Sequence, residues 1–107
     1  MMDIKKLLKR NSLALARYRD CADLWVTRAR LLMLEDNEPF SGNLQDVERC
    51  ILKALDLAPN NLEAIEEAAH YYDLVAPDRR KAVKHAKRYI GLAGKAVSDM
   101  RAILEDS

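Results

Sequence analysis

The chain has 107 residues, of which half are hydrophobic and a third are charged, as expected for a single globular domain. Its 18 basic and 17 acidic residues nearly cancel, so the net charge of +1 gives no general attraction to nucleic acid or to an acidic partner. Gly and Pro number only 3 each, while Ala, Leu, Lys, Arg and Glu dominate, which favours helices. We therefore expect one all-α domain over residues 1–107.

The sequence gives no sign of a membrane or metal protein. No apolar run approaches the roughly 20 residues that a membrane-spanning helix needs, and the charged N-terminus lacks the apolar core of a secretory signal. Cys21 and Cys50 lie far apart, without a Cys or His partner at the spacing of a zinc site. We expect two buried, reduced thiols, no metal and no cofactor, in a cytoplasmic protein.

Residues 2–18 are predicted to form the first helix, because their apolar side chains recur at helical spacing. After a short turn, Asp23 is a candidate N-cap for a second helix that ends near residue 34. The acidic segment 35–43 contains Pro and Gly, which predicts a loop that is long for a connection between neighbouring helices. Its Phe40 is expected to fold back over the hairpin end; the alternative is an exposed contact for a partner.

Helical spacing also predicts the next two helices. Asn43 is a suitable N-cap for the third helix, which Pro59 ends. Either Asn60 or Asn61 caps the fourth helix, and Asn60 with Glu63 resembles a capping box. The apolar residues of the fourth helix continue to about position 75.

A turn at Ala76-Pro77-Asp78 leads into a fifth helix, which Pro77 or Asp78 would start. Gly91 and Gly94 are expected to loosen its end near residue 93, and a short sixth helix is predicted over 95–105. The sequence thus predicts six helices without a strand. Their mostly short connections make successive helices antiparallel, as in a bundle or a solenoid.

From Pro59 onward the sequence resembles a tetratricopeptide unit, whose signature is W-x2-L-G-x2-Y, then A-x3-F and a closing Pro. The residues at the signature positions of the two helices are, in order, Ile65, Ala68, Ala69, Tyr72, Ala82 and Ala86. Tyr89 departs from the pattern, because it occupies a later position where the family has a small residue. A generic α-helical bundle is the alternative, since aliphatic residues and Ala occur in any amphipathic helix.

The preceding unit shows the same resemblance, with two departures. Its matching residues are, in order, Trp25, Ala29, Leu32, Val47, Ile51, Ala54 and Pro59. Arg28 stands where the family has Leu, and the loop before the second helix is several residues too long. The resemblance implies a short right-handed α-solenoid of antiparallel hairpins. Its parts would be a partial unit at 2–18, hairpins at 22–59 and 60–93, and a capping helix at 95–105.

The resemblance also implies a scaffold or adaptor that holds another protein or a peptide in a concave groove. The first helix of each hairpin would line this groove with Asp23, Val26, Arg30, Met33, Glu63, Glu66, His70 and Asp73. The Lys and Asn pattern with which some family members clamp a C-terminal carboxylate is absent, and Arg30 alone suits an anion. The acidic side favours a basic or mixed peptide, although a merely solvated helix face explains these charges as well.

The densest basic run suggests a second function, nucleic-acid binding. Its candidate anion-binding residues are Arg79, Arg80, Lys84, Lys87 and Arg88. Several cations together would neutralise a phosphate backbone. A helix, however, distributes such charges around its circumference, and the balanced charge of the chain also argues against nucleic acid, so a solvated face is the favoured interpretation.

No sequence motif nominates an enzyme. The chain lacks a Gly-rich phosphate loop, a Ser nucleophile elbow and an HExxH motif. Glu66 and His70 share a helix face, but no third ligand accompanies them, so a polar surface pair is favoured over a metal site. We expect a non-catalytic protein, and because short arrays leave apolar ends, we also expect self-association through a terminal helix.

Overall fold

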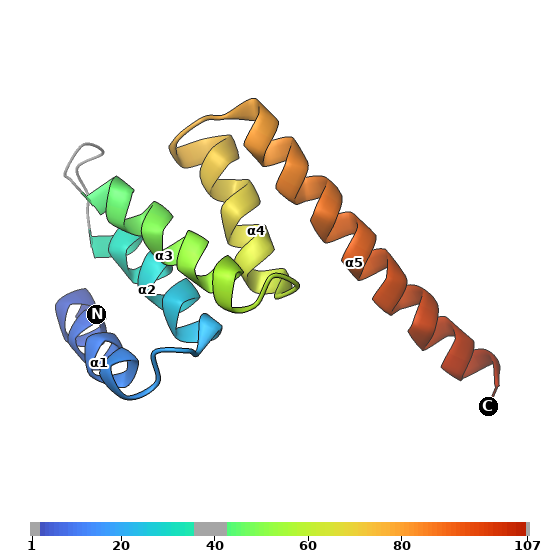
Figure 1. Cartoon of the computed structure of the whole chain (residues 1–107), viewed down its shortest axis with the longest axis horizontal. Helices are drawn as coiled ribbons and strands as arrows, with labels where there is room; N and C mark the ends of the chain where they lie inside the picture. The colour runs from blue at the N-terminus through green and yellow to red at the C-terminus, as the bar shows by residue number, and fades with distance from the viewer. Residues whose placement is uncertain (1–2, 36–42, 107) are drawn as a thin grey trace.

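The computed structural model of the chain describes residues 3–35 and 43–106 (Figure 1). Its elements are, in chain order, α1 (Ile4–Arg17), α2 (Ala22–Glu35), α3 (Asn43–Leu57), α4 (Leu62–His70), the π-helical segment η1 (Tyr71–Val75) and α5 (Arg79–Glu105). The described residues contain no strand, which confirms the all-α prediction. Most of the predicted loop 35–43, with Phe40, lies outside the described residues.

Side-chain caps begin three of the helices. Asp3, Asn61 and Asp78 each accept a hydrogen bond, 3.1 to 3.3 Å long, from the backbone N–H three residues on. Asp78 is therefore confirmed as the cap of α5. The predicted capping box at Asn60 is wrong, because the Asn60 side chain accepts a 2.6 Å hydrogen bond from Arg88 and Asn61 caps α4.

Asp23 lies inside the first turn of α2 instead of capping it, because α2 begins at Ala22. A carboxylate there still faces the positive end of the helix dipole. Its Oδ1 accepts a 3.0 Å hydrogen bond from the side-chain amide of Asn61. The same Asn61 that caps α4 thus ties the start of α4 to the start of α2.

The two helices predicted after Asp78 are a single helix of 27 residues, α5. The structure therefore has five α-helices in its described part, where the sequence predicted six. Neither Gly91 nor Gly94 has a positive φ, so both glycines continue the helix. Glycine permits a break without imposing one, and the Ala, Leu, Lys and Arg residues around these two positions favour the helix.

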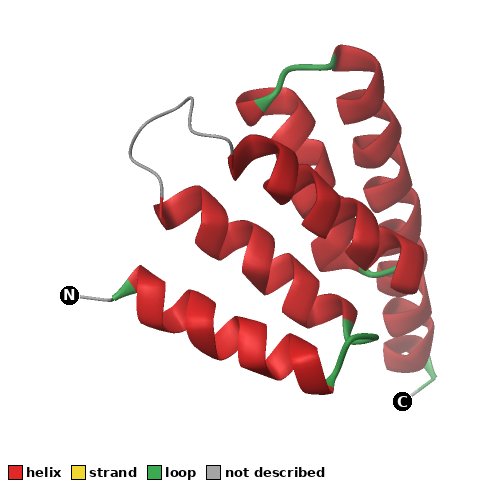
Figure 2. Ribbon diagram, turned by 60° about the vertical axis from the view of Figure 1, so that its left-hand side comes forward, coloured by secondary structure: helices red, strands yellow, loops and turns green. Residues whose placement is uncertain are grey.

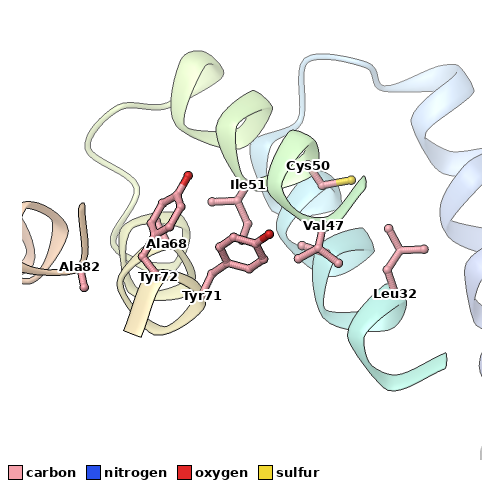
Figure 3. Close-up of a cluster of buried hydrophobic side chains, with 9 residues drawn as sticks. Leu32, Val47, Cys50, Ile51, Ala68, Tyr71, Tyr72 and Ala82 are labelled. Atoms are coloured by element: carbon pink, nitrogen blue, oxygen red, sulfur yellow. The ribbon is translucent and has the colours of Figure 1, made fainter. Parts of the chain in front are cut away.

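The helices pack in chain order, each against its predecessor (Figure 2). α1 lies on α2, α2 pairs with α3, and the α4–η1 segment pairs with α5. In addition, α4 contacts both α2 and α3, so it lies against the groove between them. Figure 3 shows side chains from α2, α3 and α4–η1 meeting in one core. Its fully or largely buried members include Leu32, Val47, Cys50, Ile51, Ala68, Tyr71, Tyr72 and Ala82.

The second half of α5 extends past the helices against which its first half packs (Figure 1). The radius of gyration, 16.0 Å, accordingly exceeds the value of about 13 Å typical of a compact domain of this length. None of the helices in residues 3–35 and 43–106 is long and apolar enough to cross a membrane.

Candidate functional site

An open groove of about 420 Å³ runs between the α4–η1 segment and the first half of α5. Small apolar side chains line it from both helices, Ala69 from α4 and Ala82 and Ala86 from α5, and we call these three residues its floor. Large side chains at these positions would fill the space between the helices. The lining residues are Glu66, Ala69, His70, Asp73, Arg79, Ala82, Val83, Ala86, Tyr89 and Ile90.

The edge of this α4–α5 groove carries charge of both signs. Glu66 and Asp73 come from the α4–η1 segment, together with His70, while Arg79 comes from the start of α5. These side chains flank an apolar floor, which is the arrangement that holds an amphipathic helix. Glu66, His70 and Asp73, which the sequence assigned to a groove, therefore line one. The helix on the other side of this groove is α5, however, and not α2 as predicted.

The other predicted groove residues lie elsewhere. Val26 is 1% exposed and belongs to the core, so its placement in an open groove is corrected: the α2 face that carries it packs against α3 and α4. Met33 is partly buried and packs against the main core cluster. Glu63 is exposed and does not line the α4–α5 groove.

Arg30 is held by carboxylates of α4. Its Nε donates a 2.6 Å hydrogen bond to Oε1 of Glu67, and a second guanidinium nitrogen lies 3.8 Å from Oε2 of Glu63. The hydrogen bond to Glu67 is the largest cause of a raised pKa of Arg30. Arg30 therefore connects α2 to α4, and an incoming anion would compete with Glu67 for it.

A second groove, also about 420 Å³ in volume, lies between α3 and α5. Its apolar wall comes from Leu52, Leu55 and Pro59, and no acidic residue lines it. Lys81, Lys84, His85 and Arg88 of α5 line it as well, together with Tyr72 of η1. Arg88 is engaged within the chain, because its guanidinium donates hydrogen bonds of 3.2 and 3.0 Å to the carbonyl oxygen of Pro59.

The predicted anion-binding residues are thus divided among different surfaces. Arg79 lines the α4–α5 groove, whereas Lys84 and Arg88 line the α3–α5 groove. Arg80 and Lys87 are exposed and line neither groove. The helical geometry of α5 distributes the basic run around the helix, as its residue spacing indicates.

Tyr72 is the centre of a polar cluster between α3, η1 and α5. Its hydroxyl donates a 2.7 Å hydrogen bond to Oε2 of Glu48, and its ring stacks on His85 with centroids 5.8 Å apart. The ammonium of Lys81 lies 5.0 Å from the Tyr72 ring centre. Burial, followed by the hydrogen bond to Glu48, raises the pKa of Tyr72, so its hydroxyl stays protonated and keeps donating.

His85 is the group in this cluster whose pKa the fold lowers. Burial is the main cause of a lowered pKa of His85, and the charges of Lys84, Arg88 and Lys81 add to it. Among the described residues, its buried Nδ1 has no hydrogen-bond partner. The folded protein therefore holds His85 in its neutral form.

The lowered pKa of His85 makes the free energy of unfolding depend on pH. Because the folded state lowers this pKa below 6.5, the unfolded chain takes up the proton first as the pH falls. The stability that neutral His85 contributes is complete above pH 6.5 and is lost below it. In urea unfolding at several pH values, His85→Gln should flatten this loss, whereas His70→Gln, at the exposed histidine, should leave it unchanged. Equal slopes in the wild type and both variants would contradict this assignment.

The described residues contain no group of three or more His, Cys, Asp or Glu placed to hold a metal ion. Both cysteines are free thiols; Cys50 is buried and Cys21 half-buried, and burial raises the pKa of the Cys50 thiol. The prediction of buried thiols therefore holds fully for Cys50 and in part for Cys21.

Sequence reasoning missed the α5 side of the α4–α5 groove, because it assigned the groove to the first helix of each hairpin, whereas the lining residues between 79 and 90 belong to a second helix. The signal was nevertheless present, since Val83, Ala86 and Ile90 recur at helical spacing and lead toward the second half of α5. A scan against models of protein families found no match, and neither a search of curated proteins nor one of solved structures found any.

Proposed function

We propose that the chain is a non-catalytic protein-interaction module, an adaptor or assembly subunit that holds a helix of another protein in the α4–α5 groove. The observation that carries the proposal is this open groove, with its floor of Ala69, Ala82 and Ala86 and its charged edge. The edge carries Glu66 and Asp73 beside Arg79, which favours a helix with basic or mixed charges beside its apolar stripe.

The packing of α4 supports a helix as the ligand. α4 already lies against α2 and α3, two helices that pair with each other as α4 pairs with α5. The α4–α5 groove is thus the next groove of the same kind, and it is open. Contacts between α2 and α4, the first helices of the two hairpins, also support a short right-handed tetratricopeptide-like α-solenoid, with α1 as its partial unit.

Nucleic-acid binding by Arg79–Arg88 remains the alternative. The three cationic residues that share the α3–α5 groove, Lys81, Lys84 and Arg88, favour it. Against it, Arg88 already binds Pro59 and Asn60, and Lys81 lies over the Tyr72 ring. A protein ligand in the α4–α5 groove therefore has the better support.

Ala86→Arg tests the proposed function. Ala86 is exposed and both residues are good helix formers, so the fold should persist while a long charged side chain blocks the groove. In pull-downs from native lysate, followed by affinity measurement with the purified partner, we expect at least a tenfold loss of binding. Leu13→Arg, at an exposed position of α1, is the matched control. A partner that binds both variants equally would exclude the groove as the site.

A further inference from the structure

The second half of α5 exposes a stripe of large apolar side chains. Val97, Met100, Ile103 and Leu104 are between 52% and 72% exposed, and with Ala96 they lie at positions i, i+1, i+4, i+7 and i+8. This spacing places them along one side of the helix. A contiguous apolar stripe of this kind marks an interaction surface.

The α4–η1 segment buries residues at the same spacing. Ala64, Ile65, Ala68, Tyr71 and Tyr72 also lie at positions i, i+1, i+4, i+7 and i+8, and none is more than 4% exposed. They are buried because α4 lies against the paired helices α2 and α3, as Figure 3 shows for part of this contact. A helix with apolar residues at this spacing therefore fits against two paired helices of this chain.

We infer that two copies of this chain associate by exchanging the second halves of their α5 helices. Residues 95–105 of each copy would lie in the α4–α5 groove of the other, as α4 lies between α2 and α3. The inference rests on the proposed function, since it names the helix that the groove holds. A second copy is the occupant because the groove and the stripe that fits it belong to the same chain.

The continuity of α5 decides between a second copy and the chain's own end. Gly91 and Gly94 are helical, so residues 95–105 continue straight past their own groove and cannot reach it without a break. In an antiparallel pair of α5 helices centred on Lys95, residues equally far from Lys95 face each other. Ala86 then faces Leu104 of the second copy, and large side chains meet small ones at the groove floor.

This pairing buries the whole stripe in both copies. From Val83 through Ala86 and Ile90, the apolar positions of α5 continue at alternating intervals of three and four residues to Leu104. That alternation is the pattern of a helix-pairing seam. The apolar positions that line the groove therefore continue without interruption into the exposed stripe of the second half of α5. A symmetric pair matches the groove of each copy to the stripe of the other.

A polar contact would recur as well. The equivalence that aligns Ile65 with Val97 also aligns Glu67 with Asp99. On the receiving helices, His70 of α4 aligns with Arg30 of α2 when Ile65 is aligned with Trp25, as in the two repeat-like units. The 2.6 Å contact between Arg30 and Glu67 would thus have a counterpart between His70 and Asp99 of the second copy.

Sedimentation equilibrium of the full chain over a micromolar concentration series tests the inference. We expect a reversible monomer–dimer equilibrium, and the double variant Val97→Glu/Met100→Glu should weaken it by about 100-fold or more, since two carboxylates would be buried against an apolar floor. The matched control is Leu13→Glu/Leu74→Glu, two exposed leucines outside the stripe, which should leave the equilibrium unchanged. A monomer at every concentration, or equal effects of both double variants, would overturn the inference.

Disulfide trapping tests the antiparallel arrangement. Mixed under mild oxidation, an Ala86→Cys chain and a Leu104→Cys chain should form a mixed disulfide dimer, while wild-type chains should not. A disulfide within a single chain of the Ala86→Cys/Leu104→Cys double variant would show that residues 95–105 fold back on their own groove, which also overturns the exchange. Homodisulfides at Leu104→Cys alone would indicate a parallel pair and count against it.

A final measurement separates this inference from the proposed function. A synthetic peptide of residues 94–106 is titrated into the Val97→Glu/Met100→Glu chain, with and without Ala86→Arg. Binding that Ala86→Arg abolishes supports the groove as a helix site even if the wild-type chain is monomeric. Failure of the peptide to bind would overturn the exchange alone, because the groove could still hold a helix of another protein, which the Ala86→Arg pull-down tests separately.

Discussion

Ile51→Ala is expected to lower the free energy of unfolding by about 2–5 kcal/mol, the largest effect of a single change considered for this chain. Ile51 is 1% exposed and projects from α3 into the core that α2 and the α4–η1 segment share (Figure 3). The loss combines removed apolar contacts with a cavity that close-packed neighbours fill only in part. For a domain whose total stability is about 5–15 kcal/mol, such a loss can leave much of the protein unfolded.

The control for this prediction is the next residue in the chain. Leu52 is 47% exposed, so Leu52→Ala should cost about 1 kcal/mol or less. The conservative change Ile51→Val should cost about 0.5–1.5 kcal/mol, which gives a graded series at one site. Urea unfolding followed by circular dichroism measures all three. Equal losses at positions 51 and 52 would mean that α3 does not present Ile51 to the core.

The second large effect is expected at Arg30. Arg30→Glu removes the 2.6 Å contact with Glu67 and places a carboxylate near both Glu67 and Glu63. The Arg30 side chain is 43% exposed, so solvent screens much of this repulsion, whereas that of Glu67 is only 14% exposed. We expect a loss of about 1–2 kcal/mol, between the values of an exposed pair and a buried one.

Exchange of the two charges separates this pair from other effects of the substitution. The double variant Arg30→Glu/Glu67→Arg should recover about half of the lost stability, because the charges again attract while the geometry is imperfect. Arg49→Glu, which disrupts the exposed pair of Arg49 with Asp46, is the control and should change stability by about 0.5 kcal/mol or less. No recovery in the double variant would show that the contact between α2 and α4 does not depend on this pair.

Parts of the fold followed from the sequence because their causes are local. Helical spacing of apolar residues predicted the helical segments, Pro59 marked the end of α3, and Asp78 marked the start of α5, where its side chain caps the helix. A cap or a proline acts on backbone groups within about one turn, so neighbouring residues suffice to place it.

The choice between Asn60 and Asn61 shows where local reasoning ends. Both are good caps, and the sequence left them as alternatives. Arg88, nearly thirty residues later, binds the Asn60 side chain, while Asn61 caps α4 and contacts Asp23. The choice was therefore made by α5 and α2, which reach this joint only in the folded chain.

The candidate site was predicted in part for the same reason. Glu66, His70 and Asp73 share a face of the fourth helix, and that face could be predicted from their spacing alone. Val26 could not be placed in this way, because α2 is surrounded by α1, α3 and α4 and its apolar faces are buried against them. Spacing identifies a helix face but does not identify the element that covers it.

The sequence by itself determined the helical class, most of the helix boundaries and the small residues that let paired helices approach. Only the tertiary structure decided that α5 continues through Gly91 and Gly94, that Arg30 is held by α4, and that an open groove lies between α4 and α5. The physical reason is the range of the interactions. Helix propensity and capping act over a few residues, whereas a groove forms only when separate helices pack against each other.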